Sequence, residues 1–576
     1  MSHDSIFPPI PIGVEDYKEI IDNKSAYIDK TLLIKEFWQD GGKVILTPRP
    51  RRFGKTLNLS MLKYFFEKTD QNNANIFENT NIWTDPEFRD LQGQFPVIFL
   101  TFKDIKVDSW KEAYEEFINL LTINIEKLLS PIYPSLTPVE QKWYARLVDR
   151  SATEADYSDS LLYATVILER HYQKKVIILI DEYDAPIIEA YIKNYYEKMI
   201  KFMRSLLSKA LKTNSALQKA FLTGITRIAK EDIFSGLNNL SIYTVLNVEY
   251  SDKFGFTQKE VDQLLVGYDL VDKKDEIKNW YDGYMFGETN IYNPWSLLNC
   301  IKNKGIFKAY WVNTSDNKLV KNIIANSNEK IKKELELLLQ NNVIINKEID
   351  EGVTFSDFDN NDQEPWSFLL FTGYLTTTSH TIIDDNYYYT LAIPNKEIEK
   401  LYQNLIFQAL STNISFAKLK ELFEALITGD KKIVEQYLQE FIAKACSSLD
   451  VAKNDLERNI HMFVLGLLAG LSSRYIIQSN RSPHLSAGTP NCESGDGRYD
   501  IMLMPRNPHD PGILIEFKRT TEDDNATLAT LAQKALEQIK NLNYKTQLKD
   551  FGYQGSIFCY GIAVCGKKLI VAMEII

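Results

Sequence analysis

The feature that most constrains this chain is a Gly-Lys-Thr tripeptide that joins a strand-like segment to a helix-like one. An apolar run at 44–47 precedes Gly54-Lys55-Thr56, and a helical pattern follows at 57–66. In a strand, loop and helix of this kind, backbone N–H groups and the helix N-terminus face the phosphates of a nucleotide. The lysine then reaches the β- and γ-phosphates, and the threonine hydroxyl ligates Mg²⁺. The tripeptide therefore predicts an ATP site of the P-loop type.

The loop before the tripeptide departs from the pattern G-x-x-x-x-G-K-[ST]. Arg49 stands where that pattern has glycine, so the loop tip is less permissive of unusual backbone angles. In return, three arginines lie within reach of the same anion. We expect the whole loop to take part in nucleotide binding, through Arg49, Arg51, Arg52, Phe53, Gly54, Lys55 and Thr56. Chance occurrence would explain Gly-Lys-Thr by itself, so the prediction depends on segments further along.

A second segment supplies the acids that such a site needs. A continuous apolar run at 176–180 ends in Asp181-Glu182. Such a run is typical of a strand buried on both faces of a parallel sheet, and ligands of open α/β sheets bind at the carboxyl ends of the strands. We expect Asp181 to hold Mg²⁺ through water and Glu182 to polarise the attacking water. The alternative, two solvated acids at a strand end, does not explain why they follow a P-loop-like element.

A third apolar run, at 220–225, ends in Thr226 and Arg227. Thr226 is placed to sense the γ-phosphate, and Arg227 to contact phosphate or to pair with Asp184. An ordinary surface arginine beside a capping threonine is an equally good interpretation.

A second chemical pattern lies near the C-terminus. Asp500 begins a strand-like run, a loop rich in Pro and Asn follows at 505–511, and the next run contains Glu516 and Lys518. Two strands joined by a short loop predict a hairpin, which returns Glu516 to the neighbourhood of Asp500. Because side chains alternate along a strand, Glu516 and Lys518 share one face and Phe517 points to the other.

Two carboxylates and a lysine in a cleft can bind Mg²⁺ and stabilise charge on a phosphate. The sequence therefore predicts Asp500, Glu516 and Lys518 as a nuclease-type site, with Asp500 and Glu516 as metal ligands. Glu-x-Lys is common, and a solvated salt bridge at a strand end is the alternative. Gln538, on a predicted helix at 526–541, is favoured as a buried or capping residue over a member of the site. Glu493 is a candidate third ligand.

Composition limits the other classes of function. The net charge of −11 argues against a chain that coats nucleic acid non-specifically, although a local basic groove stays open. Five scattered cysteines without C-x-x-C spacing indicate neither a disulfide framework nor a zinc site. The N-terminus lacks a secretory pattern, and the longest apolar helix candidate is too short to cross a bilayer. We expect a cytoplasmic protein without membrane contact, and the sequence leaves homo-oligomers open.

The chain divides into three predicted parts. Residues 1–250 alternate strand and helix patterns, as in a doubly wound α/β domain with a parallel sheet. Residues 251–400 are expected to form a helical lid or middle region packed by aromatic side chains; a base-stacking surface for single strands is the rival interpretation. Residues 401–576 lead into a last α/β unit.

Taken together, these segments resemble a specific family: bacterial AAA-like P-loop ATPases that carry a C-terminal PD-(D/E)XK nuclease-like domain. The resemblance spans most of the chain and includes the arginine-rich loop variant, which is typical of the family. Its further motifs are 11–17, 27–31, 179–184, 222–227, 254–257, 292–296, 372–376, 497–500 and 515–518. The resemblance implies an ATPase domain, a helical lid and a restriction-endonuclease-like domain, with ATP and Mg²⁺ as cofactors. The genomes in which the family is expanded suggest a part in defence or conflict with mobile DNA.

Two hypotheses from different classes follow. The first is an ATP-binding, ATP-hydrolysing switch that controls a Mg²⁺-dependent nuclease acting on DNA or RNA. The second is an ATP-gated interaction protein whose nuclease fold is vestigial. The presence of Asp500, Glu516 and Lys518 together favours the first. A secreted effector finds no support in the N-terminal residues.

Overall fold

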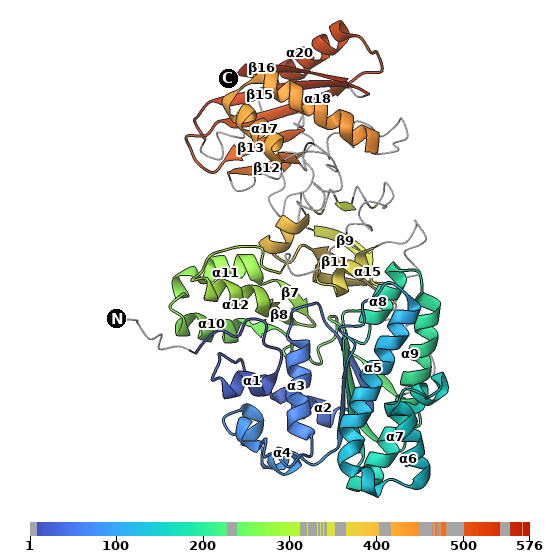
Figure 1. The fold of residues 1–576 in the computed structure, drawn as a ribbon. Coiled ribbons are helices and arrows are strands. Elements are labelled where there is room, and N and C mark those ends of the chain that lie inside the picture. Colours follow the sequence, from blue (N-terminus) through green and yellow to red (C-terminus); the bar gives the residue numbers. More distant parts are fainter. Residues whose placement is uncertain are drawn as a thin grey trace. The chain divides into compact units, whose positions relative to one another are not determined.

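In the computed structural model, the chain forms two compact units. The structure describes residues 8–226, 239–311, 343–351, 365–402, 416–448, 474–479, 500–541 and 553–576 except 567, with positions 320, 331, 334, 335, 338, 464, 467, 468 and 471. The first unit contains Met1–Asn317 and Val343–Ile398, and the second contains Lys318–Asn342 and Glu399–Ile576 (Figure 1). The three-part division at 250 and 400 stays a prediction.

The first unit is built on a five-stranded sheet in the order β2-β3-β4-β1-β5. All neighbouring strands run parallel. The strands are β1 (Val44–Pro48), β2 (Val97–Thr101), β3 (Val176–Asp181), β4 (Leu217–Gly224) and β5 (Leu240–Ile242). Every residue of β3 is buried, as its continuous apolar run predicts for a strand covered on both faces.

Helices cover both faces of this sheet (Figure 1). Helices α2 (Leu32–Gln39) and α3 (Lys55–Phe66) pack together on one face, and α5 (Trp110–Leu129), α7 (Glu154–Tyr172) and α9 (Tyr196–Leu211) pack on the other. Shorter helices complete the layers: α1 (Tyr17–Asp22), α4 (Pro86–Leu91), α6 (Pro138–Val148) and α8 (Ala185–Ile192). This arrangement confirms the expected doubly wound α/β fold of the P-loop region.

The middle region contains strands as well as the helices predicted for it. Its helices are α10 (Gln258–Gly267), α11 (Lys274–Tyr281), α12 (Pro294–Lys302) and α15 (Trp366–Phe371). One three-stranded sheet joins β6 (Phe256–Thr257), β8 (Thr289–Tyr292) and β7 (Tyr284–Phe286), and another joins β10 (Thr376–Ile383), β11 (Asn386–Ala392) and β9 (Val343–Glu348). The sequence did not predict these strands because they are short. In the first hairpin, only the tight turn at Gly287 marks the connection between β7 and β8.

Five aromatic side chains of the middle region are core residues. Trp280, Tyr281, Tyr284, Tyr292 and Trp311 are each at most 4% exposed. Because a base can stack only on an exposed ring, these residues do not form the single-strand surface considered as the rival interpretation.

The second unit is a mixed five-stranded sheet in the order β12-β13-β14-β15-β16. Its strands are β12 (Tyr475–Ser479), β13 (Ile501–Pro505), β14 (Gly512–Arg519), β15 (Ile557–Cys565) and β16 (Lys568–Ile575). The predicted hairpin is present, since β13 and β14 pair antiparallel with Ile501 opposite Ile515. Strand β14 then pairs parallel with β15. This sheet confirms the expected nuclease-like α/β unit.

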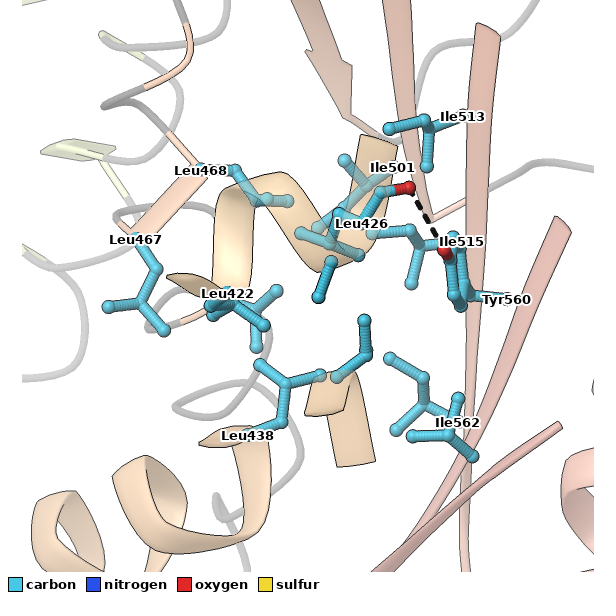
Figure 2. Packing of buried hydrophobic residues seen from close by; sticks show 14 of the residues in the cluster. Leu422, Leu426, Leu438, Leu467, Leu468, Ile501, Ile513, Ile515, Tyr560 and Ile562 are labelled. Carbon is cyan, nitrogen blue, oxygen red and sulfur yellow. Dashed lines mark hydrogen bonds between the residues drawn. The ribbon is translucent and has the colours of Figure 1, made fainter. Parts of the chain in front are cut away.

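Helices pack on both faces of the second sheet. Helix α20 (Asn525–Asn541) contacts β14, β15 and β16, and Gly561 lets it approach closely, since a Cβ there would lie 2.2 Å from the carbonyl oxygen of Ala532. Helices α17 (Phe416–Thr428) and α18 (Lys431–Ser448) contribute to the core on the opposite face. Figure 2 shows part of that core, where the Tyr560 hydroxyl donates to the carbonyl of Leu426 at 2.9 Å.

No helix in the described part of the chain is long and apolar enough to cross a membrane.

Candidate functional sites

The loop between β1 and α3 ends in a conformation that favours glycine. Gly54 has φ +84° and directly precedes the first helical residue, Lys55. A residue with a Cβ is strained at that angle, which explains glycine at this position of the motif. The first N–H groups of a helix lack partners within the helix, so the start of α3 is an end that favours an anion.

Lys55, the first residue of α3, lies against this loop. Its ammonium group donates to the carbonyl oxygens of Arg49 at 3.2 Å and of Pro50 at 3.3 Å, and it forms an ion pair with Glu182 at 3.2 Å. The side chain of Lys55 is 3% exposed. The ammonium group of Lys55 is thus surrounded by the loop. A phosphate group could replace its present partners, the two carbonyl oxygens and Glu182.

The predicted magnesium residues meet at the end of β3. The Thr56 hydroxyl donates to Asp181 Oδ2 at 2.7 Å, and the Thr223 hydroxyl donates to Asp181 Oδ1 at 2.7 Å. Burial raises the pKa of Asp181, and the neighbouring Glu182 adds to the effect. Sequence reasoning missed Thr223, although a threonine inside an otherwise apolar strand beside the acids is a signal that could have found it.

Glu182 has the geometry expected of a functional residue. Its φ of +51° lies in the left-handed region, which costs on the order of 1 kcal/mol or more for a residue with a side chain. Burial favours the protonated form, but the charges of Lys55 and Arg51 outweigh it and lower the pKa of Glu182. A charged carboxylate beside the loop lysine can accept a proton from a water molecule.

Asp184 accepts hydrogen bonds from the residues that directly follow β4. Its Oδ2 accepts from the backbone N–H groups of Ile225 and Thr226, both at 2.8 Å, and from the Thr226 hydroxyl at 3.0 Å. Burial, and then the charge of Glu182, raise the pKa of Asp184 to about 6. The phosphate-sensing role of Thr226 stays a prediction, and Arg227 lies outside the described residues.

One of the three loop arginines does not face the expected anion. The Arg49 guanidinium is fully buried and donates to the carbonyl oxygens of Tyr243 at 2.7 Å and Tyr250 at 3.3 Å. It also lies over the rings of Phe254 and Phe286. The expectation that Arg49 reaches phosphate is corrected accordingly, because its guanidinium donates to backbone carbonyl groups of the segment that follows β5.

The other loop residues divide between the site and the packing around it. Arg52 stacks on the half-buried Trp295, with its guanidinium carbon 4.3 Å from the ring centroid. Arg51 acts electrostatically on Glu182. The Phe53 ring is 1% exposed and lies against Tyr284 and Phe286, so it anchors the loop to the middle region.

The second candidate site forms where β13 and β14 pair. Asp500 Oδ2 accepts from the backbone N–H of Phe517 at 2.7 Å, which brings it to the strand that carries Glu516. Glu516 Oε1 accepts from Lys518 at 3.4 Å. Phe517 joins the core on the opposite face of the sheet, as strand alternation predicts.

Gln538 belongs to this site, contrary to the preference expressed from the sequence. Its amide nitrogen donates to Glu516 Oε1, and its carbonyl oxygen accepts from the Lys518 ammonium group. The packing of α20 on β14 brings the glutamine there, a long-range contact that helix periodicity does not reveal.

Within the described part of the chain, Glu516 is paired through only one of its two carboxylate oxygens. It is 3% exposed, and its Oε2 atom is buried without a hydrogen-bond partner. Burial, and then the charge of Asp500, raise its pKa to about 7. A hard cation beside Oε2 would remove both penalties, so this acid pair fits Mg²⁺, which needs only one or two carboxylates and keeps several waters.

Among the described residues no group of three or more His, Cys, Asp or Glu side chains forms a metal cluster. The proposed third ligand, Glu493, lies outside those residues. The metal roles of Asp500, Glu516, Thr56 and Asp181 therefore stay predictions.

Family models match two separate parts of the chain. A family model described as a predicted AAA-ATPase matches residues 11–234, and one described as the PD-(D/E)XK nuclease superfamily matches residues 455–574. A similar chain is an uncharacterized protein from the vnfD 5′ region of Azotobacter chroococcum mcd 1, 25% identical over 447 residues. That match covers 75% of this chain and 77% of the relative. The resemblance found from the sequence is confirmed.

Proposed function

We propose that this chain, an AAA-ATPase-like region followed by a PD-(D/E)XK nuclease-like domain, is an ATP-hydrolysing switch that controls Mg²⁺-dependent cleavage of nucleic acid. The observation that carries the cleavage half is the unpartnered, buried Oε2 of Glu516 beside Asp500 and Lys518. Two neighbouring carboxylates with an unpaired oxygen are ligands that a hard divalent cation takes.

At the P-loop, the residues divide the work between binding and hydrolysis. Lys55 exchanges its present partners for the β- and γ-phosphates, while Thr56 and Asp181 hold the magnesium ion that accompanies ATP. Glu182, released from Lys55, orients the attacking water and accepts its proton. Thr226 would contact the γ-phosphate from the end of β4.

At the C-terminal site, Asp500 and Glu516 would hold Mg²⁺, which supplies a water of lowered pKa and neutralises charge on the phosphate. Lys518 adds a positive charge near the scissile phosphate, and Gln538 fixes the positions of Glu516 and Lys518. The substrate class is a phosphodiester of DNA or RNA. We place the activity in the cytoplasm, and a role in conflict with mobile DNA is the biological setting that the family resemblance suggests.

The test is a cleavage assay on single- and double-stranded DNA and RNA, with Mg²⁺, with and without ATP. The parent should cut at least one substrate, and Asp500→Ala and Glu516→Ala should each lose about 10²–10³-fold in rate. Lys518→Ala should lose rate with less effect on metal affinity, because its charge acts on the phosphate.

A matched control is Glu522→Ala, which removes an exposed acid just beyond β14. It should cut at the parental rate. If the parent cuts nothing in any nucleotide state, the interaction-protein hypothesis replaces this proposal. If Asp500→Ala and Glu516→Ala cut as fast as the parent, the nuclease site lies elsewhere.

A further inference from the structure

The P-loop is enclosed by side chains from the middle region. Phe53 packs on Tyr284 and Phe286, and its carbonyl oxygen accepts from the backbone N–H of Gly255 at 3.1 Å. Gly373 lies so close to Pro50 that a Cβ at the glycine would be 2.8 Å from the proline Cβ. A change in the shape of the loop must therefore be accommodated by the middle region.

One of these contacts reaches a tryptophan with two roles. The Trp311 indole N–H donates to the carbonyl oxygen of Arg51, inside the loop, at 3.1 Å. The backbone N–H of the same residue donates to Glu397 Oε1 at 2.6 Å. Trp311 is 1% exposed, so neither bond competes with water.

Glu397 extends this connection. Its second oxygen, Oε2, accepts from the Ser296 hydroxyl at 2.7 Å, at the start of α12. The carboxyl group is fully buried. One acid thus holds the segment that ends at Trp311 against the segment that ends at Ile398.

Trp311 and Glu397 both lie next to places where the chain passes from one unit to the other. The first unit consists of Met1–Asn317 and Val343–Ile398. Trp311 lies just before the chain first leaves that unit, and Glu397 lies just before it leaves for the second time. The hydrogen bonds that Trp311 donates to the Arg51 carbonyl oxygen and to Glu397 therefore join the P-loop to both exits.

Nucleotide binding would act directly on the hydrogen bonds that join Arg51, Trp311 and Glu397, which we call the relay. The Lys55 ammonium group now donates to the carbonyl oxygens of Arg49 and Pro50, the two residues directly before Arg51. When Lys55 turns to phosphate, these carbonyl oxygens lose their donor, and the loop changes the environment of the Arg51 carbonyl. A ligand can shift a conformation only through such a difference in contacts between two states.

We propose that Trp311 and Glu397 couple nucleotide occupancy of the P-loop to the second unit, by fixing or releasing both exits of the chain from the first unit. This inference rests on the proposed function, because it assumes that the P-loop binds ATP. Trp311 and Glu397 are positioning residues: they touch neither phosphate nor metal.

The experiment is hydrogen exchange on the full chain, with and without a non-hydrolysable ATP analogue, read in peptides from α17 and α18 of the second unit. In the parent, the analogue should change exchange rates there by at least about twofold. Trp311→Phe keeps a ring but removes the indole donor. It should bind the analogue with the parental affinity and lose the change in α17 and α18.

Trp143→Phe is the matched control, because the Trp143 indole nitrogen is buried without a hydrogen-bond partner. It should respond like the parent. Glu397→Ala should lose the response, and Glu397→Gln should retain it, because the amide oxygen still accepts from the Trp311 N–H.

Two results overturn the inference and can be told apart by calorimetry. If the parent binds the analogue but the second unit does not respond, or if Trp311→Phe responds like the parent, the relay is wrong and the ATPase proposal stands. If the parent binds no nucleotide, the proposed function fails and the inference fails with it.

Discussion

The acids predicted to bind metal at the two sites, Asp181 and Glu516, differ in how their oxygens are satisfied. At the P-loop, both oxygens of Asp181 accept hydroxyl groups, one from Thr56 and one from Thr223. At the C-terminal site, Glu516 shares one oxygen between Lys518 and Gln538, and its other oxygen is buried without a partner.

This difference indicates when each site binds metal. Asp181 already has partners that a cation would have to displace, and a Mg²⁺ ion there would gain its remaining ligands from the phosphates of ATP. Glu516 pays the cost of an unpartnered buried oxygen, which a cation relieves directly. We therefore expect nucleotide-dependent metal binding at the P-loop and nucleotide-independent binding at the C-terminal site.

The largest expected effect is the loss of ATP binding at the first site when one positive charge is removed, with no change at the second site. Lys55→Ala should abolish ATP binding measured by calorimetry, because the ammonium group provides the charge for the phosphates. Cleavage-site metal binding should be unchanged. Lys63→Ala, further along α3 and paired with Glu67, is the control and should bind ATP normally. Parental affinity in a well-folded Lys55→Ala protein would remove the P-loop assignment.

The next largest effect is a loss of ATP hydrolysis at the first site without a loss of ATP binding. Glu182→Gln should bind ATP and lose hydrolysis by about 10²–10⁴-fold, since an amide does not accept the proton of the attacking water. A phosphate-release assay measures this loss. Glu189→Gln, on the following helix α8, should hydrolyse ATP at the parental rate. Equal rates in parent and Glu182→Gln would exclude Glu182 from the mechanism.

A smaller effect concerns the glutamine that the sequence did not assign to the second site. Gln538→Ala leaves Glu516 and Lys518 without their shared partner, so cleavage should fall by about tenfold, the value of one hydrogen bond to a charged group. Its exposed neighbour gives the control, Glu537→Ala, which should cut normally. An unchanged rate for Gln538→Ala would make the glutamine a packing residue.

The smallest effect comes from a buried acid outside both sites. Burial raises the pKa of Glu397 from 4.5 to about 7. Because the folded protein holds this proton more tightly than the unfolded chain, the acid stabilises the fold at low pH, and that contribution is lost as pH rises from about 4.5 through 7. This pH-dependent contribution to the free energy of unfolding is at most about 3 kcal/mol.

Glu397→Gln removes this titration and keeps the shape of the side chain. Denaturant unfolding between pH 4.5 and 7.5 should therefore show a flatter pH dependence in the variant than in the parent. Parallel curves would mean that Glu397 titrates in its ordinary range.

The sequence predicted the parts of both sites that depend on local order along the chain. Asp181 and Glu182 were found because a buried parallel strand ends where ligands bind. Asp500, Glu516 and Lys518 were found because a hairpin and strand alternation place them together. These rules need only the pattern of neighbouring residues.

The parts that the sequence missed depend on contacts between distant segments. Arg49 was expected at the anion, but a long side chain can leave its loop, and here the carbonyl groups of Tyr243 and Tyr250 receive it. Gln538 enters its site only because α20 packs on β14, and Thr223 only because β4 lies beside β3.

One measurement tests the difference between the two sites most directly: titration of the nucleotide-free protein with Mn²⁺, a magnesium substitute, followed by electron paramagnetic resonance. The account predicts one bound ion per chain, lost in Glu516→Gln and kept in Asp181→Asn. Addition of ATP should then reveal a second ion that Asp181→Asn loses. Without nucleotide, binding that survives Glu516→Gln and disappears in Asp181→Asn would contradict the account.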